Sequence, residues 1–211
     1  MGQSSALAAP SSREKILDVA ERLFARAGYA GVGLREVAEQ VGLGKSSLFH
    51  HFDTKDQLYC EVLARVLGRI RLHLDPVVKA EISPAEKLVR WVEALVDALA
   101  EQPTTARLLM RELVEDEQFR PGELPEAAAA EDNLAGILKG IRELLDEGVA
   151  RGIFRSVSVP QTVQTLIGAT VYHFASGEFG DTLLGRPLLS AEAIKLRKQE
   201  LVSMLQFGLV A

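Results

Sequence analysis

The sequence predicts an all-α protein of about nine helices, and three observations support this fold class. Apolar residues recur at the i, i+3, i+4, i+7 spacing of one helix face through nearly every long segment. Ser or Thr residues stand where several segments begin, some with Glu or Gln three residues later, as in a helix capping box. No segment shows a convincing alternation of apolar and polar residues, and the nearest candidate, 156–159, is too short for a strand.

Three helices are expected near the N-terminus. Ser11 and Glu14 form a capping box for the first helix, which Gly28 ends. The second helix covers 34–41, and the third covers about 45–51.

Six further helices are expected in the rest of the chain. Thr54 and Gln57 offer a capping box for the first of them, and Asp75-Pro76 is expected to end it. A loop is expected over 118–125, and Gly177 is expected to break the penultimate helix. The six helices are placed at 55–74, from Pro84, at 103–115, at 126–151, from Pro160, and from Ser190 to the C-terminus.

Composition restricts the class of protein. The chain has 211 residues, of which 47% are hydrophobic and 25% charged, enough for one good core or two modest ones. No run approaches the roughly 18 apolar residues of a membrane span. Residues 1–10 lack the features of a secretory signal, so a disordered arm is expected there. The single Cys60 excludes an intramolecular disulfide and suits the cytoplasm.

Charge is unevenly distributed along the chain. Residues 1–74 hold 10 Lys and Arg against 8 Asp and Glu, a net charge of +2, whereas residues 75–211 hold 14 against 21, a net charge of −7. The first third therefore repels a polyanion less than the rest does. It is not basic enough for charge alone to indicate nucleic acid binding.

The stretch GLGKSS, residues 42–47, resembles the end of a phosphate-binding loop, but two requirements of that loop are missing. The first glycine of the pattern is replaced by Glu39, a negative charge where a phosphate would lie. The loop must also follow a buried strand, whereas the preceding residues have the apolar spacing of a helix. Two short helices joined by Gly42-Leu43-Gly44 instead predict a helix-turn-helix.

The two faces of the third helix differ in character. At 100° per residue, Leu48 and Phe52 point together toward the core. Ser46, Ser47 and His50 lie opposite them, and such hydroxyl and imidazole groups suit base edges and phosphates. Lys45 and Phe49 flank this face on one side and His51 on the other.

The stretch GYAGVGLREVAEQVGLGKSSLFHHFDTKDQLYCEVL resembles the DNA-binding region of the TetR family of bacterial transcription regulators. The resemblance covers about residues 12–63, where several fixed spacings of the family motif agree at once. The matching residues are Ala38, Gly42, Lys45, Leu48, His50, Phe52, Lys55 and Leu58, with Phe49 at the position of a common tyrosine. Gly33 and Gly44 stand where the family usually has a capping Ser or Thr, so two hydroxyls that would contact phosphate are absent.

The resemblance implies two domains, a helix-turn-helix DNA-binding domain over 11–53 and a ligand-binding and dimerisation domain over 54–211. The expected DNA-contacting residues are Arg35, Lys45, Ser46, Ser47, Phe49, His50 and Lys55. The candidate ligand-pocket residues are Trp91, Arg107, Met110, Glu112, Phe119, Tyr172, His173 and Phe174. The last two helices are expected to pair with those of a second subunit through Leu166, Gly168, Ala169, Val171, Val202 and Leu205.

The function implied is a dimeric repressor that binds a palindromic DNA operator and is released by a small apolar molecule. A small-molecule binding protein whose helix-turn-helix no longer reads DNA is the alternative that the two glycine caps favour. An enzyme is not indicated, because no Gly-x-Ser-x-Gly elbow or other catalytic constellation is present. Neither a metal nor another cofactor is expected, since the adjacent His50 and His51 diverge by about 100° and no Cys or carboxylate lies at ligand spacing.

Overall fold

The computed structural model describes residues 11–114 and 124–210, and these residues form ten helices. The all-α prediction is confirmed, with ten helices in place of about nine. The expected arm at 1–10 lies outside the described residues. The helices are α1 (Ser12–Ala27), α2 (Leu34–Val41), α3 (Lys45–Phe49), α4 (Lys55–Lys79), α5 (Pro84–Glu101), α6 (Pro103–Val114), α7 (Pro125–Ala150), α8 (Val159–Ala175), α9 (Gly177–Leu184) and α10 (Ala191–Leu209).

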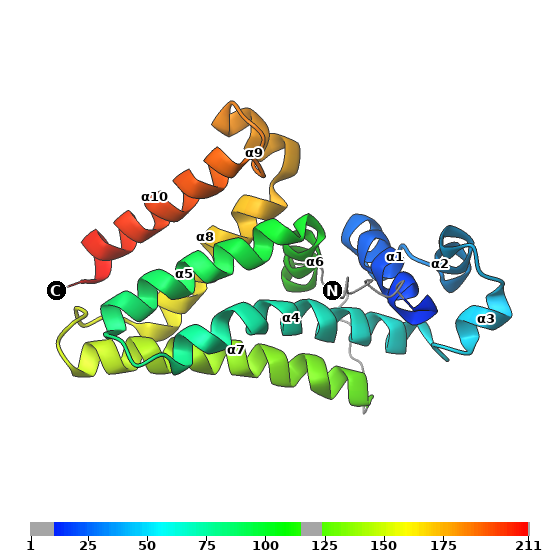
Figure 1. Ribbon diagram of the computed structural model, residues 1–211, viewed down its shortest axis with the longest axis horizontal. Coiled ribbons are helices and arrows are strands. Elements are labelled where there is room, and N and C mark those ends of the chain that lie inside the picture. The colour runs from blue at the N-terminus through cyan, green and yellow to red at the C-terminus, as the bar shows by residue number, and fades with distance from the viewer. Residues whose placement is uncertain (1–10, 115–123, 211) are drawn as a thin grey trace, which may run out of the picture.

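The molecule is elongated, with α1–α3 at one end and the remaining helices packed behind them (Figure 1). Helix α4 leads from the small domain into the large one, and α7 runs beside it in the same direction. Gln57 near the start of α4 donates to Glu126 near the start of α7, and Val78 at the other end packs against Gly140. A Cβ at Gly140 would lie 3.0 Å from Val78, so the glycine allows the two helices to approach closely.

Helix α4 continues past the proline that was expected to end it. Pro76 lies inside the last turn, and the helix runs on to Lys79. A proline this close to the C-terminus removes one backbone hydrogen bond, and the turn is held because Leu74 is buried and Val77 and Val78 pack against the core. The expected end at residue 74 was therefore wrong.

Helix α9 was missed by sequence reasoning. Gly177, with a φ of 55°, does break the chain after α8, but a further helix of eight residues begins there. The turn after α9 is fixed by the Asp181 carboxylate, which accepts a hydrogen bond from the Leu188 amide at 2.7 Å. A hydrogen bond between residues seven positions apart leaves no apolar stripe in the sequence, so the pattern did not predict this turn or the helix before it.

Among residues 11–114 and 124–210, no helix is long and apolar enough to cross a membrane.

Candidate nucleic-acid interface and ligand cavity

The turn between α2 and α3 has the geometry that its glycines suggest. Gly42 adopts a left-handed φ of 77° and ends α2, and the Leu43 amide donates to the Ala38 carbonyl at 2.9 Å. Leu48 and Phe52 are fully buried in the core that α1 and α2 complete. This packing fixes which face of α3 is turned outward.

The outward face of α3 presents polar side chains to solvent. Ser46, Ser47 and His50 are exposed, and Phe49 is 36% exposed. The side chain of Lys45 lies outside the described part of the chain. The described face therefore offers two hydroxyls and an imidazole, which donate to or accept from base edges and phosphates.

Gly33 and Gly44 cap α2 and α3 without any side-chain hydrogen bond. Both have ordinary negative φ values, −107° and −66°, and a Cβ added at either would meet nothing within 4 Å. Neither position therefore requires glycine. A serine at either place would fit and would supply the missing cap.

Two basic residues predicted to contact DNA, Arg35 and Lys55, lie in different settings. Arg35 is largely exposed and pairs with Glu39 one turn along α2, at 2.9 Å. Lys55 begins α4, where its Nζ lies 4.2 Å from the centre of the Tyr29 ring and 3.5 Å from the Ala30 carbonyl oxygen. Burial lowers the pKa of Lys55. Arg35 is thus an exposed residue paired with a carboxylate, whereas Lys55 is held against Tyr29.

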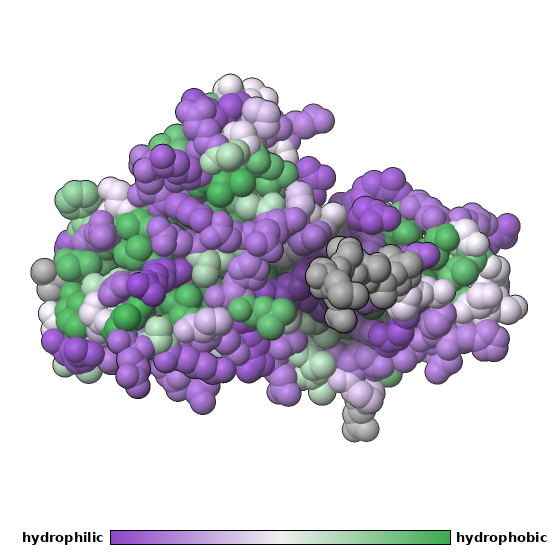
Figure 2. Space-filling model, in the orientation of Figure 1, coloured by the Kyte–Doolittle hydropathy of each residue, from purple (hydrophilic) through white to green (hydrophobic). Residues whose placement is uncertain are grey.

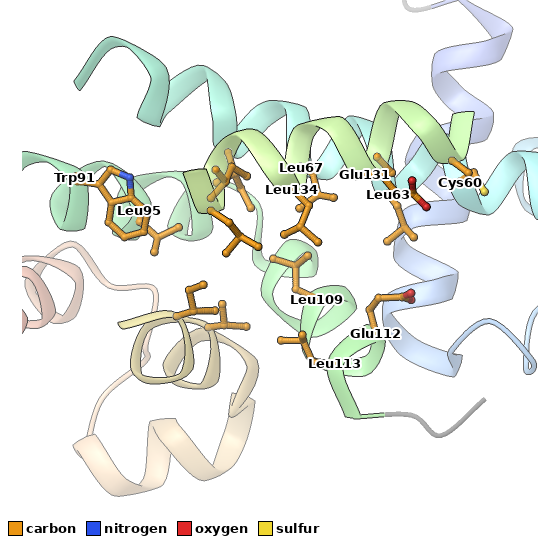
Figure 3. A pocket seen from close by; sticks show the side chains of 17 residues that line it. Cys60, Leu63, Leu67, Trp91, Leu95, Leu109, Glu112, Leu113, Glu131 and Leu134 are labelled. Atoms are coloured by element: carbon orange, nitrogen blue, oxygen red, sulfur yellow. The ribbon is translucent and has the colours of Figure 1, made fainter. Parts of the chain in front are cut away.

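A cavity of about 360 Å³ lies in the large domain where five helices converge (Figure 3). Helices α4 and α7 supply most of its wall, and α5, α6 and α8 close it. Its volume is within the range of small-molecule sites in proteins. The lining residues are Cys60, Leu63, Leu67, Ile70, Trp91, Leu95, Leu109, Glu112, Leu113, Ala127, Ala130, Glu131, Leu134, Ile137, Leu138, Ile167 and Val171.

The family models of known proteins match both parts of the chain. Residues 16–62 match the model described as bacterial regulatory proteins of the tetR family, and residues 84–205 match the tetracyclin repressor-like C-terminal domain. The chain belongs to the TetR family. It is therefore a ligand-responsive transcriptional regulator.

Individual relatives agree with this assignment. The chain is 30% identical over 145 residues to the HTH-type transcriptional repressor KstR2 of Mycolicibacterium smegmatis. The matched region covers 69% of this chain and 68% of the repressor. The solved structure of the ketosteroid transcriptional regulator KstR2 of Mycobacterium tuberculosis has a TM-score of 0.76 at 22% identity, covering 96% and 97% of the two chains. FadR of Bacillus subtilis in complex with stearoyl-CoA has a TM-score of 0.67 at 19% identity, covering 91% and 96%. Both structures show the TetR fold.

Two of the residues predicted for the TetR ligand pocket, Trp91 and Glu112, line the cavity. Met110 packs against the core instead, and Phe174 is buried there with 4% exposure. Arg107 is exposed and lies against Gly177 of α9, while Phe119 lies outside the described residues. Most of the wall comes from apolar side chains of α4 and α7, and none of these was among the predicted pocket residues.

Tyr172 and His173 line a second cavity, which lies among α8, α9 and α10. Burial, and then the positive charge of Arg197, lowers the pKa of His173 to about 4. The buried Nε2 of His173 and the Nε of Arg197 have no hydrogen-bond partner among the described residues. These side chains thus serve this region and not the apolar cavity.

The residues predicted for the dimer interface divide into two groups. Leu166 and Val171 are each 3% exposed and point into their own protomer, where Val171 lines the cavity, so they are not free to meet a partner. Gly168 is exposed, and Ala169, Val202 and Leu205 are partly buried. Figure 2 shows apolar side chains at the surface beside α8, α9 and α10. The large apolar side chains exposed on these helices are Tyr172, Phe179, Leu183, Leu184, Leu196, Met204 and Phe207.

Several contacts join the small domain to the helices of the cavity. On α4, Arg65 pairs with Asp18 of α1, and Arg69 pairs with the buried Glu21 at 2.7 Å. On α6, Thr104 donates to the same Glu21 carboxylate at 2.8 Å. The α1 helix is therefore attached to two of the helices that form the cavity wall.

Proposed function

We propose that this regulator is a repressor that binds a near-palindromic DNA operator as a homodimer and is released when an apolar effector fills the cavity between α4 and α8. The helix-turn-helix residues 11–53 form the DNA-binding domain, and residues 54–211 form the effector and dimerisation domain. As a DNA-binding protein of bacterial type it works in the cytoplasm, without a cofactor and without catalytic activity.

The observation that carries this proposal is that α4 and α6 each serve both sites. Helix α4 lines the cavity through Leu63 and Leu67 and binds α1 through Arg65 and Arg69. Helix α6 lines the cavity through Leu109 and Leu113 and binds α1 through Thr104. A ligand that moves these helices therefore moves the small domain with them.

Release follows as a population shift. An effector that binds better to one arrangement of α4 and α6 increases the population of that arrangement by its difference in affinity. In a symmetric dimer this changes the separation of the two α3 helices, which must match the half-site spacing of the operator. The apolar wall suits a ligand with an apolar body, and the stearoyl chain of the stearoyl-CoA in the FadR structure and the ketosteroid in the name of KstR2 are apolar groups of this kind.

The dimer is proposed to form through α8, α9 and α10, because their exposed apolar side chains would be covered by a two-fold partner. Figure 1 shows none of these three helices beside α2 and α3, which lie at one end of the molecule. Pairing there leaves both α3 helices free to meet DNA.

The test is selection of bound fragments from genomic DNA, including the promoter region beside the regulator's own gene, followed by a screen for apolar compounds that release them. The proposal expects a near-palindromic sequence, two chains per site and release by at least one compound. Effector binding without any selected DNA would instead support the alternative of a binding protein that no longer reads DNA.

A further inference from the structure

The cavity has an apolar body and an acidic end. Every lining residue is apolar except Cys60, Glu112 and Glu131. Figure 3 shows these three residues at one end of the cavity and Trp91 at the other. Glu112, Glu131 and Leu113 are exposed, whereas Trp91 is fully buried. The acidic end is therefore the mouth of the cavity, and the indole closes its inner end.

The negative charge at the mouth is not neutralised within the described part of the chain. None of the described lining residues is Lys, Arg or His, and neither Glu112 nor Glu131 belongs to an ion pair there. The described partner of Glu112 is neutral, because the Tyr59 hydroxyl donates a hydrogen bond to it. By contrast, Asp18 and Glu21 of α1 each pair with an arginine of α4.

The thiol of Cys60 also lies near carboxylates. The pKa of Cys60 is raised to about 12, mainly by burial. The carboxylates of Asp56, Glu126 and Glu112 raise this pKa further. All the charged groups that act on this thiol are thus negative. A ligand headgroup at the mouth meets an excess of carboxylates.

The inner end of the cavity also has an unused polar group. The buried Nε1 of Trp91 has no hydrogen-bond partner among the described residues. A buried N–H without a partner is less favourable than one that is paired.

From this arrangement we propose that the effector is an amphiphilic cation, whose apolar body fills the cavity and whose ammonium or other cationic headgroup lies between Glu112 and Glu131. The inference rests on the proposed function, because it assigns the chemical class of the effector that the cavity binds. A cationic group is favoured near two carboxylates, whereas a carboxylate or phosphate headgroup is repelled by them. The apolar body gains from burial against leucine and isoleucine side chains.

The single tryptophan of the chain makes this testable, since Trp91 lies in the cavity wall and its fluorescence reports occupancy. Four probes that share a ten-carbon chain are titrated below their micelle-forming concentrations: decyltrimethylammonium, decanol, decanoate and decanoyl-CoA. The cation is expected to bind about tenfold more tightly than decanol, given roughly two- to fivefold from each partly exposed carboxylate. Decanoate and decanoyl-CoA are expected to bind more weakly than decanol.

Charge-removing variants identify the groups responsible. Glu131→Gln and Glu112→Gln are each expected to weaken binding of decyltrimethylammonium by roughly two- to fivefold while leaving decanol unchanged. Glutamine at 112 still accepts the Tyr59 hydrogen bond, so the fold is retained. Asp132→Asn is the matched control, because it removes the same charge from the next residue of α7, which is exposed and does not line the cavity. It is expected to leave all four affinities unchanged.

Several outcomes would overturn the proposal: equal binding of the four probes, tighter binding of decanoate or decanoyl-CoA, no binding of the cation, or an equal effect of Asp132→Asn. Operator release is measured separately for each probe. Release by decanoyl-CoA but not by the cation would leave the proposed function standing and refute the charge assignment. Tight, Glu131-dependent binding of the cation without effect on any operator would support the charge assignment and refute the proposed function.

Discussion

The Arg111 guanidinium of α6 donates a hydrogen bond to the backbone oxygen of Arg26, at 2.8 Å, where α1 ends. It also donates to the Ala25 oxygen at 3.1 Å. The last carbonyls of a helix lack partners within the helix and carry its negative dipole end, so an arginine there serves as both donor and counter-charge. Arg111 precedes Glu112 at the mouth of the cavity. Two adjacent residues of α6 thus contact the proposed DNA-binding domain and the proposed effector site.

Arg111→Ala is expected to separate effector binding from operator release. The cavity wall stays intact, so effector affinity measured by Trp91 fluorescence should change less than about twofold, while the effector concentration needed to release the operator rises by roughly fivefold or more. Arg107→Ala, on an exposed position of the same helix, is the control and should change neither. Unchanged release in Arg111→Ala would show that Arg111 does not carry the coupling, which would then rest on the contacts of Glu21 with Arg69 and Thr104.

Replacing Lys55 is expected to weaken binding to all DNA sequences alike. Lys55 lies at the start of α4, outside α3, where a phosphate contact is the simplest role. Lys55→Ala should therefore reduce the slope of log affinity against log salt by about one unit. The measurement is operator affinity across a panel of sequence variants at two salt concentrations.

His50→Ala and Ser46→Ala should behave differently, because both side chains are exposed on the outward face of α3. Loss of a good base contact is expected to relax preference at particular operator positions by about 1–3 kcal/mol. The same panel of variants measures this. A change of base preference in Lys55→Ala with none in His50→Ala and Ser46→Ala would contradict the proposed docking.

Gly44→Ser is expected to strengthen both the fold and DNA binding. The position has an ordinary φ of −66° and free space around a Cβ, and a hydroxyl there would cap α3 and reach phosphate. The free energy of unfolding should rise by roughly 0.4–1 kcal/mol, measured by denaturant titration. Gly42→Ser is the contrasting control, since its φ of 77° disfavours any side chain and should make that variant less stable. Equal effects of the two substitutions would refute the capping argument.

Gly168→Phe is expected to weaken dimerisation without disturbing the protomer. Gly168 is exposed on α8, and an added Cβ meets nothing within 4 Å, so the bulk projects toward a partner. Light scattering at micromolar concentration should show a dimer for the wild type and a larger monomer fraction for the variant. A wild-type protein that is monomeric under these conditions would refute the proposed dimer.

Stability is expected to fall on acidification through His173. The folded pKa of about 4 lies below the ordinary value of about 6.5, so between these pH values the unfolded chain binds a proton that the folded chain does not. The contribution of His173 is present above pH 6.5 and is lost as the pH falls toward 4. His173→Gln should make the melting temperature depend less on pH across this window. An unchanged pH dependence would mean that His173 is accessible to protons in the fold.

The sequence alone determined most of the helical framework. Capping residues and apolar stripes act within one helix, so Ser11 with Glu14 and the stop at Gly28 are as expected. The left-handed Gly42 and the burial of Leu48 and Phe52 follow from the same local rules. The solvent-facing side of α3, which is proposed to read DNA, was therefore predictable, because it is the face opposite those two residues.

Only the tertiary structure decided which apolar side chains line a cavity and which are core. The periodicity of a helix fixes the direction in which a side chain points, but not what lies opposite it. Leu67 and Leu74 share the same stripe of α4, yet Leu67 lines the cavity, whereas Leu74 is buried in the core and does not line it. Likewise, the inward direction of Val171, the length of α4 beyond Pro76 and the existence of α9 depend on neighbours distant in the sequence, because packing between helices supplies the energy that local propensity lacks.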